Sequence, residues 1–166
     1  MDGRARGRDR APRWHVGHLR RRRQGRLRAR HPFDGDGFYV VEQYRYPVAG
    51  RYIEFPQGSW EESPGADPAE LARGELAEET GLRAGSMRYL GHLSEAYGYS
   101  NQGFHVYLAT DLQRGEQSLS DEEADLRVVH LPVEQLRKAI LDGRIKDAPT
   151  LAALTLLQLA EPNLFK

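Results

Sequence analysis

The chain has 166 residues and a mass of 18.9 kDa, which fits one folded domain. Hydrophobic residues make up 39% and charged residues 29%, and no apolar run approaches the roughly 18 residues that a membrane-spanning helix needs. The absence of cysteine excludes disulfide bridges, thiolate metal sites, iron–sulfur clusters and a cysteine nucleophile. We therefore expect a soluble, cytoplasmic protein with no signal peptide near Met1 and no membrane partner.

The net charge of zero conceals two parts of opposite charge. Residues 1 to 32 hold 12 arginines and two aspartates, whereas residues 33 to 166 hold 12 basic and 22 acidic side chains. Three interpretations of the basic part stay open: a solvated tail, an arm that binds a polyanion such as RNA, and an artefact of translation. Trp14 is its one large aromatic residue, which argues against a surface that stacks nucleic-acid bases. We assign residues 1–32 as an Arg-rich segment without regular structure and residues 33–166 as the folded domain.

From Phe33 onward the residue pattern alternates between strands and helices, which predicts an α/β fold. Strands are expected at residues 37–42, 51–55, 87–93, 104–109 and 126–131. Helices are expected at residues 68–80, 133–141 and 149–160. The segment from Gln113 to Ala124 is rich in Glu, Ser and Gly and predicts a mobile surface loop.

The helix expected at residues 68–80 has clear start and stop signals. Asp67 is a good N-cap, Pro68 suits the first helical position, and Gly81 can adopt the left-handed conformation that ends a helix.

Three glutamates of this helix, Glu75, Glu78 and Glu79, stand at positions i, i+3 and i+4. At that spacing the carboxylates project within an arc of about 100° and repel one another. A solvated acidic face is one interpretation. A hard divalent cation held between the carboxylates is the other, because it would cancel the repulsion.

The segment from Glu75 to Leu82 resembles the end of the Nudix box, the signature of the Nudix hydrolase family, and matches it in all six specified places. Two departures bear on the neighbours of the glutamates. The arginine expected before Glu75 is Gly74, with Arg73 one place early. Counted back from the helix, the loop glutamate of the box falls at Ala66 and its first glycine at Trp60, whereas Gly58 stands two residues earlier. The loop is therefore longer by two, and whether Glu61 or Glu62 replaces the missing glutamate stays open.

The similarity extends over about residues 33 to 160 and is greatest to ADP-ribose pyrophosphatases of this family. It is carried by residues 41–47, 54–58, 98–109, 121–128 and 142–148. The resemblance implies a Nudix-type α/β/α sandwich with a mixed sheet. It also implies metal-dependent hydrolysis of the pyrophosphate bond of a nucleoside diphosphate derivative, with ADP-ribose giving AMP and ribose 5-phosphate. The expected partners are a small-molecule nucleotide substrate and a second copy of the chain in a homodimer.

The chemistry needs Mg²⁺, for which Mn²⁺ can substitute, to neutralise the pyrophosphate and to acidify a water. We predict Glu75 and Glu79 as its ligands, Glu78 as a catalytic residue that shares a second ion, and the backbone carbonyl near Gln57 as a further ligand.

The general base is predicted to lie outside this helix, at Glu122 or Glu123 in the acidic loop. Arg45 could bind substrate phosphate, with Glu54 beside it in the substrate site, or it could form an ion pair with Glu54. Tyr44 or Tyr46 could stack on a base or belong to the core.

Two other functions stay open on the sequence alone. One is a Nudix-fold module that binds or senses a nucleotide without cleaving it. The other is an RNA-processing Nudix enzyme guided by the Arg-rich segment.

The Arg-rich segment stands where family members have strands that often form a homodimer. One permitted choice of codons for Trp14 to Pro32, read from the second nucleotide, gives GTSGIYGVVDKADFALVIP, which contains two strand-like runs. Restoring one C in the codons for Pro32 would lead this reading into Phe33. A shift of reading frame would therefore explain the missing strands and the charge split together, and it would leave the homodimer surface compromised in the chain as written.

Overall fold

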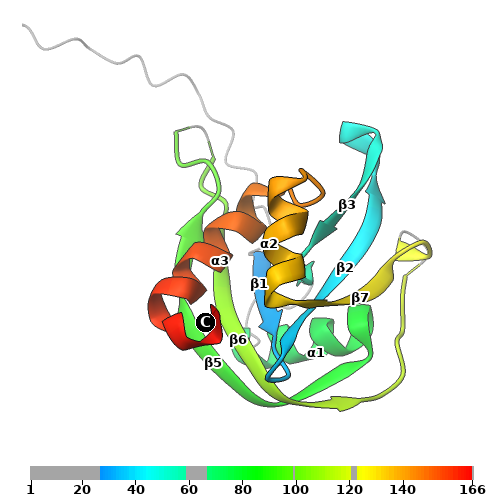
Figure 1. Ribbon diagram of the computed structural model, residues 1–166, viewed down its shortest axis with the longest axis vertical. Coiled ribbons are helices and arrows are strands. Elements are labelled where there is room, and N and C mark those ends of the chain that lie inside the picture. The colour runs from blue at the N-terminus through cyan, green and yellow to red at the C-terminus, as the bar shows by residue number, and fades with distance from the viewer. Residues whose placement is uncertain (1–26, 59–66, 99, 121–122, 166) are drawn as a thin grey trace, which may run out of the picture.

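The computed structural model describes residues 27–58, 67–98, 100–120 and 123–165 (Figure 1). One sheet has the strand order β4-β1-β6-β5, with β1 at Leu27–Pro32, β4 at Gln57–Gly58, β5 at Leu82–Ser94 and β6 at Gly103–Arg114. In this sheet β1 runs parallel to β6, while β4 and β5 pair antiparallel with their neighbours. A second, antiparallel sheet has the order β3-β2-β7, with β2 at Gly37–Arg45, β3 at Gly50–Glu54 and β7 at Arg127–Pro132.

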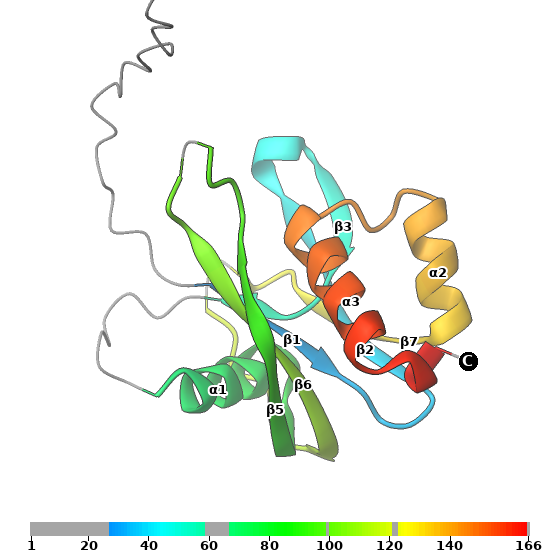
Figure 2. The ribbon, with the colours of Figure 1, turned by 90° about the vertical axis from the view of Figure 1, so that its left-hand side faces the viewer.

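The helices are α1 at Pro68–Thr80, α2 at Val133–Leu141 and α3 at Ala148–Ala160, with short 3₁₀ turns at Tyr46–Val48 and Pro162–Phe165. Figure 2 shows α1 on one side of the strands β1 and β6, with α3 and α2 on the other. Helices therefore cover both faces of a mixed sheet, as the resemblance implied. Within the described residues, no helix has the length and apolar character required to span a lipid bilayer.

The hydrophobic core lies between the two sheets and the helices α2 and α3. Its fully buried side chains include Phe38, Ile53, Phe55, Leu136 and Leu157. These residues come from β2, from β3 and the residue that follows it, and from the two helices, so burial of their apolar surface fixes the β2–β3 hairpin against α2 and α3.

Every helix and strand predicted from the sequence is present and differs from the structure only at its ends, whereas the strands β1 and β4 were not predicted. Helices α1 and α2 have the predicted bounds, and α3 begins one residue earlier, at Ala148. Strands β2, β5 and β6 are longer than expected, because backbone pairing continues beyond the apolar runs that marked them. Sequence patterns identify the buried part of a strand and not the paired part.

The folded part of the chain begins before Phe33, in contrast to the assignment from sequence. Leu27–Pro32 form β1, which pairs with β4 on one side and with β6 on the other. Two polar residues of β1, Arg30 and His31, have no exposed surface. Backbone pairing on both edges outweighs the poor strand propensity of this arginine-rich stretch. The remainder of the Arg-rich segment, residues 1–26, lies outside the described residues.

His31 is held as a neutral imidazole in the core. Its Nδ1 atom lies 3.2 Å from the carbonyl oxygen of Tyr107 and therefore carries the proton. The centroid of its ring lies 4.1 Å from that of Phe55. Nε2 is buried and has no hydrogen-bond partner among the described residues. Burial lowers the pKa of His31 from 6.5 to about 4, against the opposing effect of the Tyr107 carbonyl.

We predict that His31 makes the protein sensitive to acid. The second imidazole proton of His31 binds to the unfolded chain at higher pH than to the folded chain. The contribution of neutral His31 to the free energy of unfolding is therefore complete above pH 6.5 and is lost as the pH falls toward 4. The free energy of unfolding should fall by about 3 kcal/mol more in the native chain than in His31→Leu over this window. Urea unfolding at pH 7 and pH 4 measures the difference. His92→Leu, an exposed position on β5, is the control. Equal acid sensitivity in the native chain and His31→Leu would contradict the prediction.

Candidate active site

Helix α1 places the predicted metal ligands, and its ends are fixed as the sequence indicates. The side chain of Asp67 accepts a hydrogen bond of 2.9 Å from the backbone N–H of Ala69, and Pro68 opens the helix. Gly81 ends it with φ 68°, a left-handed conformation that suits glycine. These caps set the rotation of the helix and hence the direction of its glutamates.

The three glutamates of α1 do not share one environment. Glu75 and Glu79 are buried, with exposed fractions of 6% and 4%, whereas Glu78 is exposed. Glu75 lies against Gly58 of β4, where a Cβ atom would come within 1.7 Å of the Glu75 Oε2 atom. Glycine at position 58 therefore leaves the space that the Glu75 carboxylate occupies.

The carboxyl group of Glu79 has a strongly perturbed pKa. Burial raises its pKa to about 8, Arg30 acts in the opposite direction, and the carboxylates of Glu75, Glu123 and Glu54 add to the rise. Its Oε2 atom is buried and has no hydrogen-bond partner within the described part of the chain. An open, buried carboxylate oxygen surrounded by other carboxylates is a position where a cation would be bound strongly.

A cation of the protein already lies beside this pair. The Arg30 Nη2 atom is 3.7 Å from the Glu75 Oε2 atom, and the Arg30 side chain is fully buried. Arg73, the nearest match to the arginine of the Nudix box, instead pairs with Glu70 and donates to the carbonyl of Ala84. The arginine beside the glutamates therefore comes from β1 and not from α1.

The segment after β6 is attached to the C-terminal end of α1. The backbone N–H groups of Gly115 and Ser118 donate to the carbonyls of Gly81 and Glu78, at 2.6 and 3.0 Å. The side-chain amide of Gln117 donates to the carbonyl of Glu79 at 2.6 Å. These bonds satisfy carbonyl groups at the end of the helix, and they anchor a segment that we expected to be a mobile loop.

The same segment leads to one of the two candidate bases. Glu123 accepts a hydrogen bond of 2.9 Å from the Ser120 hydroxyl, and its charge contributes to the pKa of Glu79. The structure therefore brings Glu123 toward the glutamates of α1. Glu122 lies outside the described residues.

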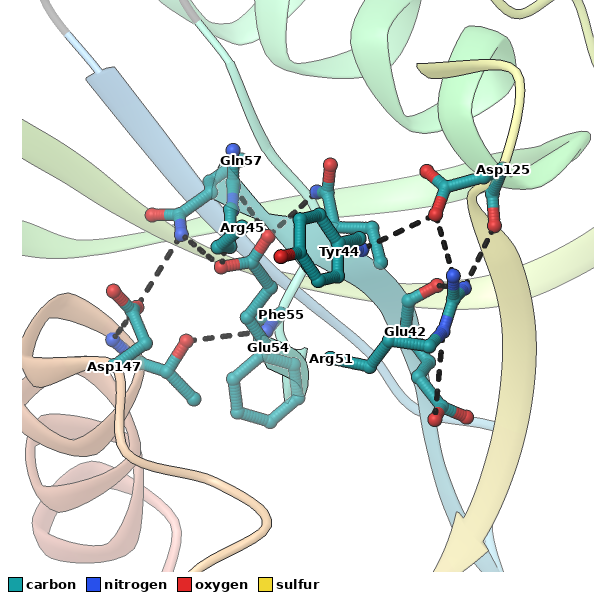
Figure 3. Close-up of polar contacts among 11 residues, drawn as sticks. Glu42, Tyr44, Arg45, Arg51, Glu54, Phe55, Gln57, Asp125 and Asp147 are labelled. Carbon is teal, nitrogen blue, oxygen red and sulfur yellow. Dashed lines mark hydrogen bonds and ion pairs between the residues drawn. The ribbon is translucent and has the colours of Figure 1, made fainter. Parts of the chain in front are cut away.

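Glu54 is the centre of a hydrogen-bond network at the end of β3 (Figure 3). It is 3% exposed, accepts 2.6 and 3.2 Å bonds from the amides of Gln43 and Gln57, and forms an ion pair with Arg45. Burial raises the pKa of Glu54, while Arg45 opposes the rise. The sequence left two roles open for Arg45, binding of substrate phosphate and an ion pair with Glu54, and the structure shows the ion pair.

Helix α3 joins this network through its N-terminal end. The Gln57 amide also donates to Asp147 at 3.3 Å, and Asp147 caps α3 by accepting from the backbone N–H of Thr150. The Thr150 hydroxyl accepts from the backbone N–H of Phe55. The side-chain amide of Gln57 thus donates to both Glu54 and Asp147. The role of the Gln57 backbone carbonyl as a metal ligand stays a prediction.

The aromatic residues proposed for base stacking are on the surface. Tyr44 is 46% exposed and Tyr46 is 87% exposed, so neither belongs to the core. The backbone N–H of Tyr44 donates to Asp125, which also binds Arg51 (Figure 3). Tyr44 therefore lies on an exposed strand end close to Arg45.

The residues present fit a magnesium ion in their chemistry. Mg²⁺ prefers oxygen ligands, often takes only one or two protein carboxylates, and keeps several waters. Glu75 and Glu79 supply such a pair, with an open oxygen on Glu79. In the described ranges, however, no three His, Asp or Glu side chains converge on one point that could hold a metal ion.

Sequence reasoning missed Arg30, Gln43 and Asp147. Each acts through a contact between residues distant in the chain, as in the 3.7 Å pair from Arg30 to Glu75. The N-cap position of Asp147 before Pro149 was a local signal for Asp147. No local pattern distinguishes Arg30 from the other arginines around it.

The family model described as the NUDIX domain matches residues 13–154. The chain therefore belongs to the Nudix family. A crystal structure described as an ADP compounds hydrolase has the same fold, with a TM-score of 0.73 and 25% sequence identity over 83% of this chain and 73% of that chain.

Characterised relatives include three bacterial proteins at similar distance. A methanol dehydrogenase activator of Bacillus methanolicus is 33% identical over 74% of this chain and 65% of its own length. ADP-ribose pyrophosphatases of Mycobacterium tuberculosis and Bacillus subtilis are 33% and 31% identical, over 73% and 74% of this chain and 58% and 65% of their own lengths. The chain thus matches less than two thirds of the length of these relatives.

We predict that Gly58→Ala weakens binding of a divalent cation at least about tenfold, an amount equivalent to about 1.4 kcal/mol. The added Cβ would lie 1.7 Å from the Glu75 Oε2 atom and would therefore displace the carboxylate. Titration calorimetry with Mn²⁺ measures the effect. Gly98→Ala is the matched control, because a Cβ there meets nothing within 4 Å. Unchanged Mn²⁺ affinity in Gly58→Ala would show that Glu75 is not a ligand.

Proposed function

We propose that the protein is a Nudix hydrolase that cleaves the pyrophosphate bond of a nucleoside diphosphate derivative, with ADP-ribose as the substrate that gives AMP and ribose 5-phosphate. The observation that carries the proposal is the buried pair Glu75 and Glu79 with an open oxygen on Glu79. The names of two relatives and of the similar crystal structure support the choice of ADP-ribose.

Mg²⁺, or Mn²⁺ in its place, would be held by Glu75 and Glu79, where it would neutralise the pyrophosphate and acidify a water. Glu78, exposed on the same helix, is proposed to share a second ion that arrives with the substrate. The caps of α1 and the bonds from Gly115, Gln117 and Ser118 hold these side chains in position.

The base that takes the proton from the attacking water is proposed to be Glu123 or Glu122. Glu123 is bound to Ser120 in this structure and lies in the segment anchored to α1, from which it can turn toward a water near Glu79. Arg45 lowers the pKa of Glu54 against the larger effect of burial, and its partly exposed guanidinium has further N–H groups for a phosphate oxygen. The proposal includes a cytoplasmic location and a homodimer.

The test is a hydrolysis panel with ADP-ribose, other sugar nucleotides and dinucleotides, each with and without Mg²⁺. We expect the largest kcat/KM for ADP-ribose and no turnover after chelation. A nucleotide sensor is the second candidate, because the buried Arg30 beside Glu75 could stand in for a metal ion. Binding of ADP-ribose without hydrolysis of any compound would favour the sensor.

We predict that Glu75→Gln and Glu79→Gln each lower turnover at least about 100-fold and keep the fold. Each change removes an anionic ligand and preserves the shape of the side chain. Steady-state hydrolysis at saturating Mg²⁺ measures the loss, with Glu70→Gln, on the exposed side of α1, as the control. Circular dichroism checks the fold. Near-native activity in both variants would refute the proposed ligands.

The same assay identifies the base. Glu122→Gln and Glu123→Gln, made singly and together, should leave one variant with a large loss of kcat and the other near the native value. Full activity of the double variant at saturating Mg²⁺ would place the base elsewhere.

For residues 1–32 we propose that the arginine-rich sequence results from a shift of reading frame. The off-frame reading puts valine and isoleucine at the positions of Arg30 and His31, and both positions are fully buried in β1. Apolar side chains suit such positions, whereas an unpaired buried imidazole nitrogen is costly.

Sequencing the genomic DNA across this stretch tests the proposal, which expects one additional C in the codons near Pro32. An in-frame arginine-rich reading, with the same peptide found in the native protein by mass spectrometry, would overturn it. That result would favour a polyanion-binding arm, whose RNA affinity would fall steeply with salt.

A further inference from the structure

We propose that Arg30 is an internal counter-cation of the pair Glu75 and Glu79 and that it competes with a divalent metal ion for Glu75. The inference rests on the proposed function, because it concerns the same carboxylates. It applies to the chain as it stands, in which arginine occupies position 30.

The first step is the charge of Arg30 in a dry environment. Its side chain is fully buried in β1, between β4 and β6. A guanidinium cannot lose its proton in a protein, and a buried charge needs a nearby opposite charge. The Glu75 Oε2 atom, 3.7 Å from the Arg30 Nη2 atom, supplies that charge.

The second step is the position of the partner. Glu75 is 6% exposed and lies against Gly58, so its carboxylate has little freedom to move. Glu79 is one helical turn further along α1, and its buried Oε2 atom is open. Helix α1 contacts β1 (Figure 2), and the ion pair between Arg30 and Glu75 joins the two elements.

The third step is the competition itself. A divalent ion bound to Glu75 and Glu79 would lie within a few ångströms of the Arg30 charge, where burial strengthens their repulsion. Binding the metal would also take Glu75 away from Arg30 and leave the guanidinium without that counter-charge. The two cations would therefore share the single negative charge of the Glu75 carboxylate.

The consequence is a weakened metal site in which removal of the arginine charge improves metal binding. We expect Arg30→Met to lower the Kd for Mn²⁺ at least about tenfold relative to the native chain. Methionine preserves the length of the side chain and fills an apolar space without charge. The metal-free variant should melt at a lower temperature than the native chain, and saturating Mn²⁺ should raise its Tm by more.

The experiment measures Mn²⁺ binding directly, by electron paramagnetic resonance and by titration calorimetry, without substrate. Arg73→Met is the matched control, because Arg73 contacts Glu70 and the carbonyl of Ala84 on another side of α1. Its Mn²⁺ affinity should stay within about twofold of the native value. Arg30→Gln, neutral and polar, is the second variant in case Arg30→Met does not fold.

The outcomes separate this inference from the proposed function. Equal or weaker Mn²⁺ binding in the neutral Arg30 variants, with measurable binding in the native chain, would overturn the competition and leave the metal-dependent hydrolase intact. Absence of Mn²⁺ binding in the native chain and in every variant would overturn both. Tighter binding in Arg30→Met or Arg30→Gln and not in Arg73→Met supports the inference.

Discussion

The burial of two neighbouring carboxyl groups, Glu75 and Glu79, is the constraint to which the rest of the site responds. Two carboxylates one helical turn apart repel, and burial increases the cost because it removes the water that would screen them. The structure meets that cost with a guanidinium from β1 at 3.7 Å from Glu75 and with space over Gly58 for the carboxylate. Repulsion between Glu75 and Glu79 destabilises the isolated helix, and the same repulsion favours binding of a cation between the two carboxylates.

The surroundings of α1 hold these glutamates in place from two directions. The segment after β6 satisfies carbonyls at the C-terminal end of the helix, and it carries Glu123 toward the same region. On the other side, the buried Glu54 links β2, β3 and β4 through Gln43, Arg45 and Gln57. Hydrogen bonds and an ion pair around one buried carboxylate restrict the side chains that form them, and a site that binds a phosphate group in one orientation needs such restricted side chains.

The departures from the Nudix box acquire a physical meaning in the tertiary structure. Gly74 stands in place of the arginine that normally precedes the glutamate at position 75. Arg73 forms an ion pair with Glu70 and donates to a backbone carbonyl of β5. Positive charge near the glutamates is still present, but it comes from Arg30 on a strand that the sequence did not indicate. The fold is therefore that of the family, while the balance of charge around the proposed metal ligands is particular to this chain.

The sequence by itself determined the elements whose signals are local. Asp67, Pro68 and Gly81 fixed the bounds of α1, and the apolar runs located five of the six described strands that follow Phe33, because capping and periodicity depend on neighbours in the chain. The two-residue strand β4 was not predicted. The spacing of the glutamates and the resemblance to the Nudix box indicated the site. Only the tertiary structure decided that Glu75 and Glu79 are buried while Glu78 is exposed, and that Arg45 pairs with Glu54. It also decided that Arg30 and His31 lie inside a central strand, since pairing between β1 and β6 joins residues more than 70 positions apart, a contact that no local pattern encodes.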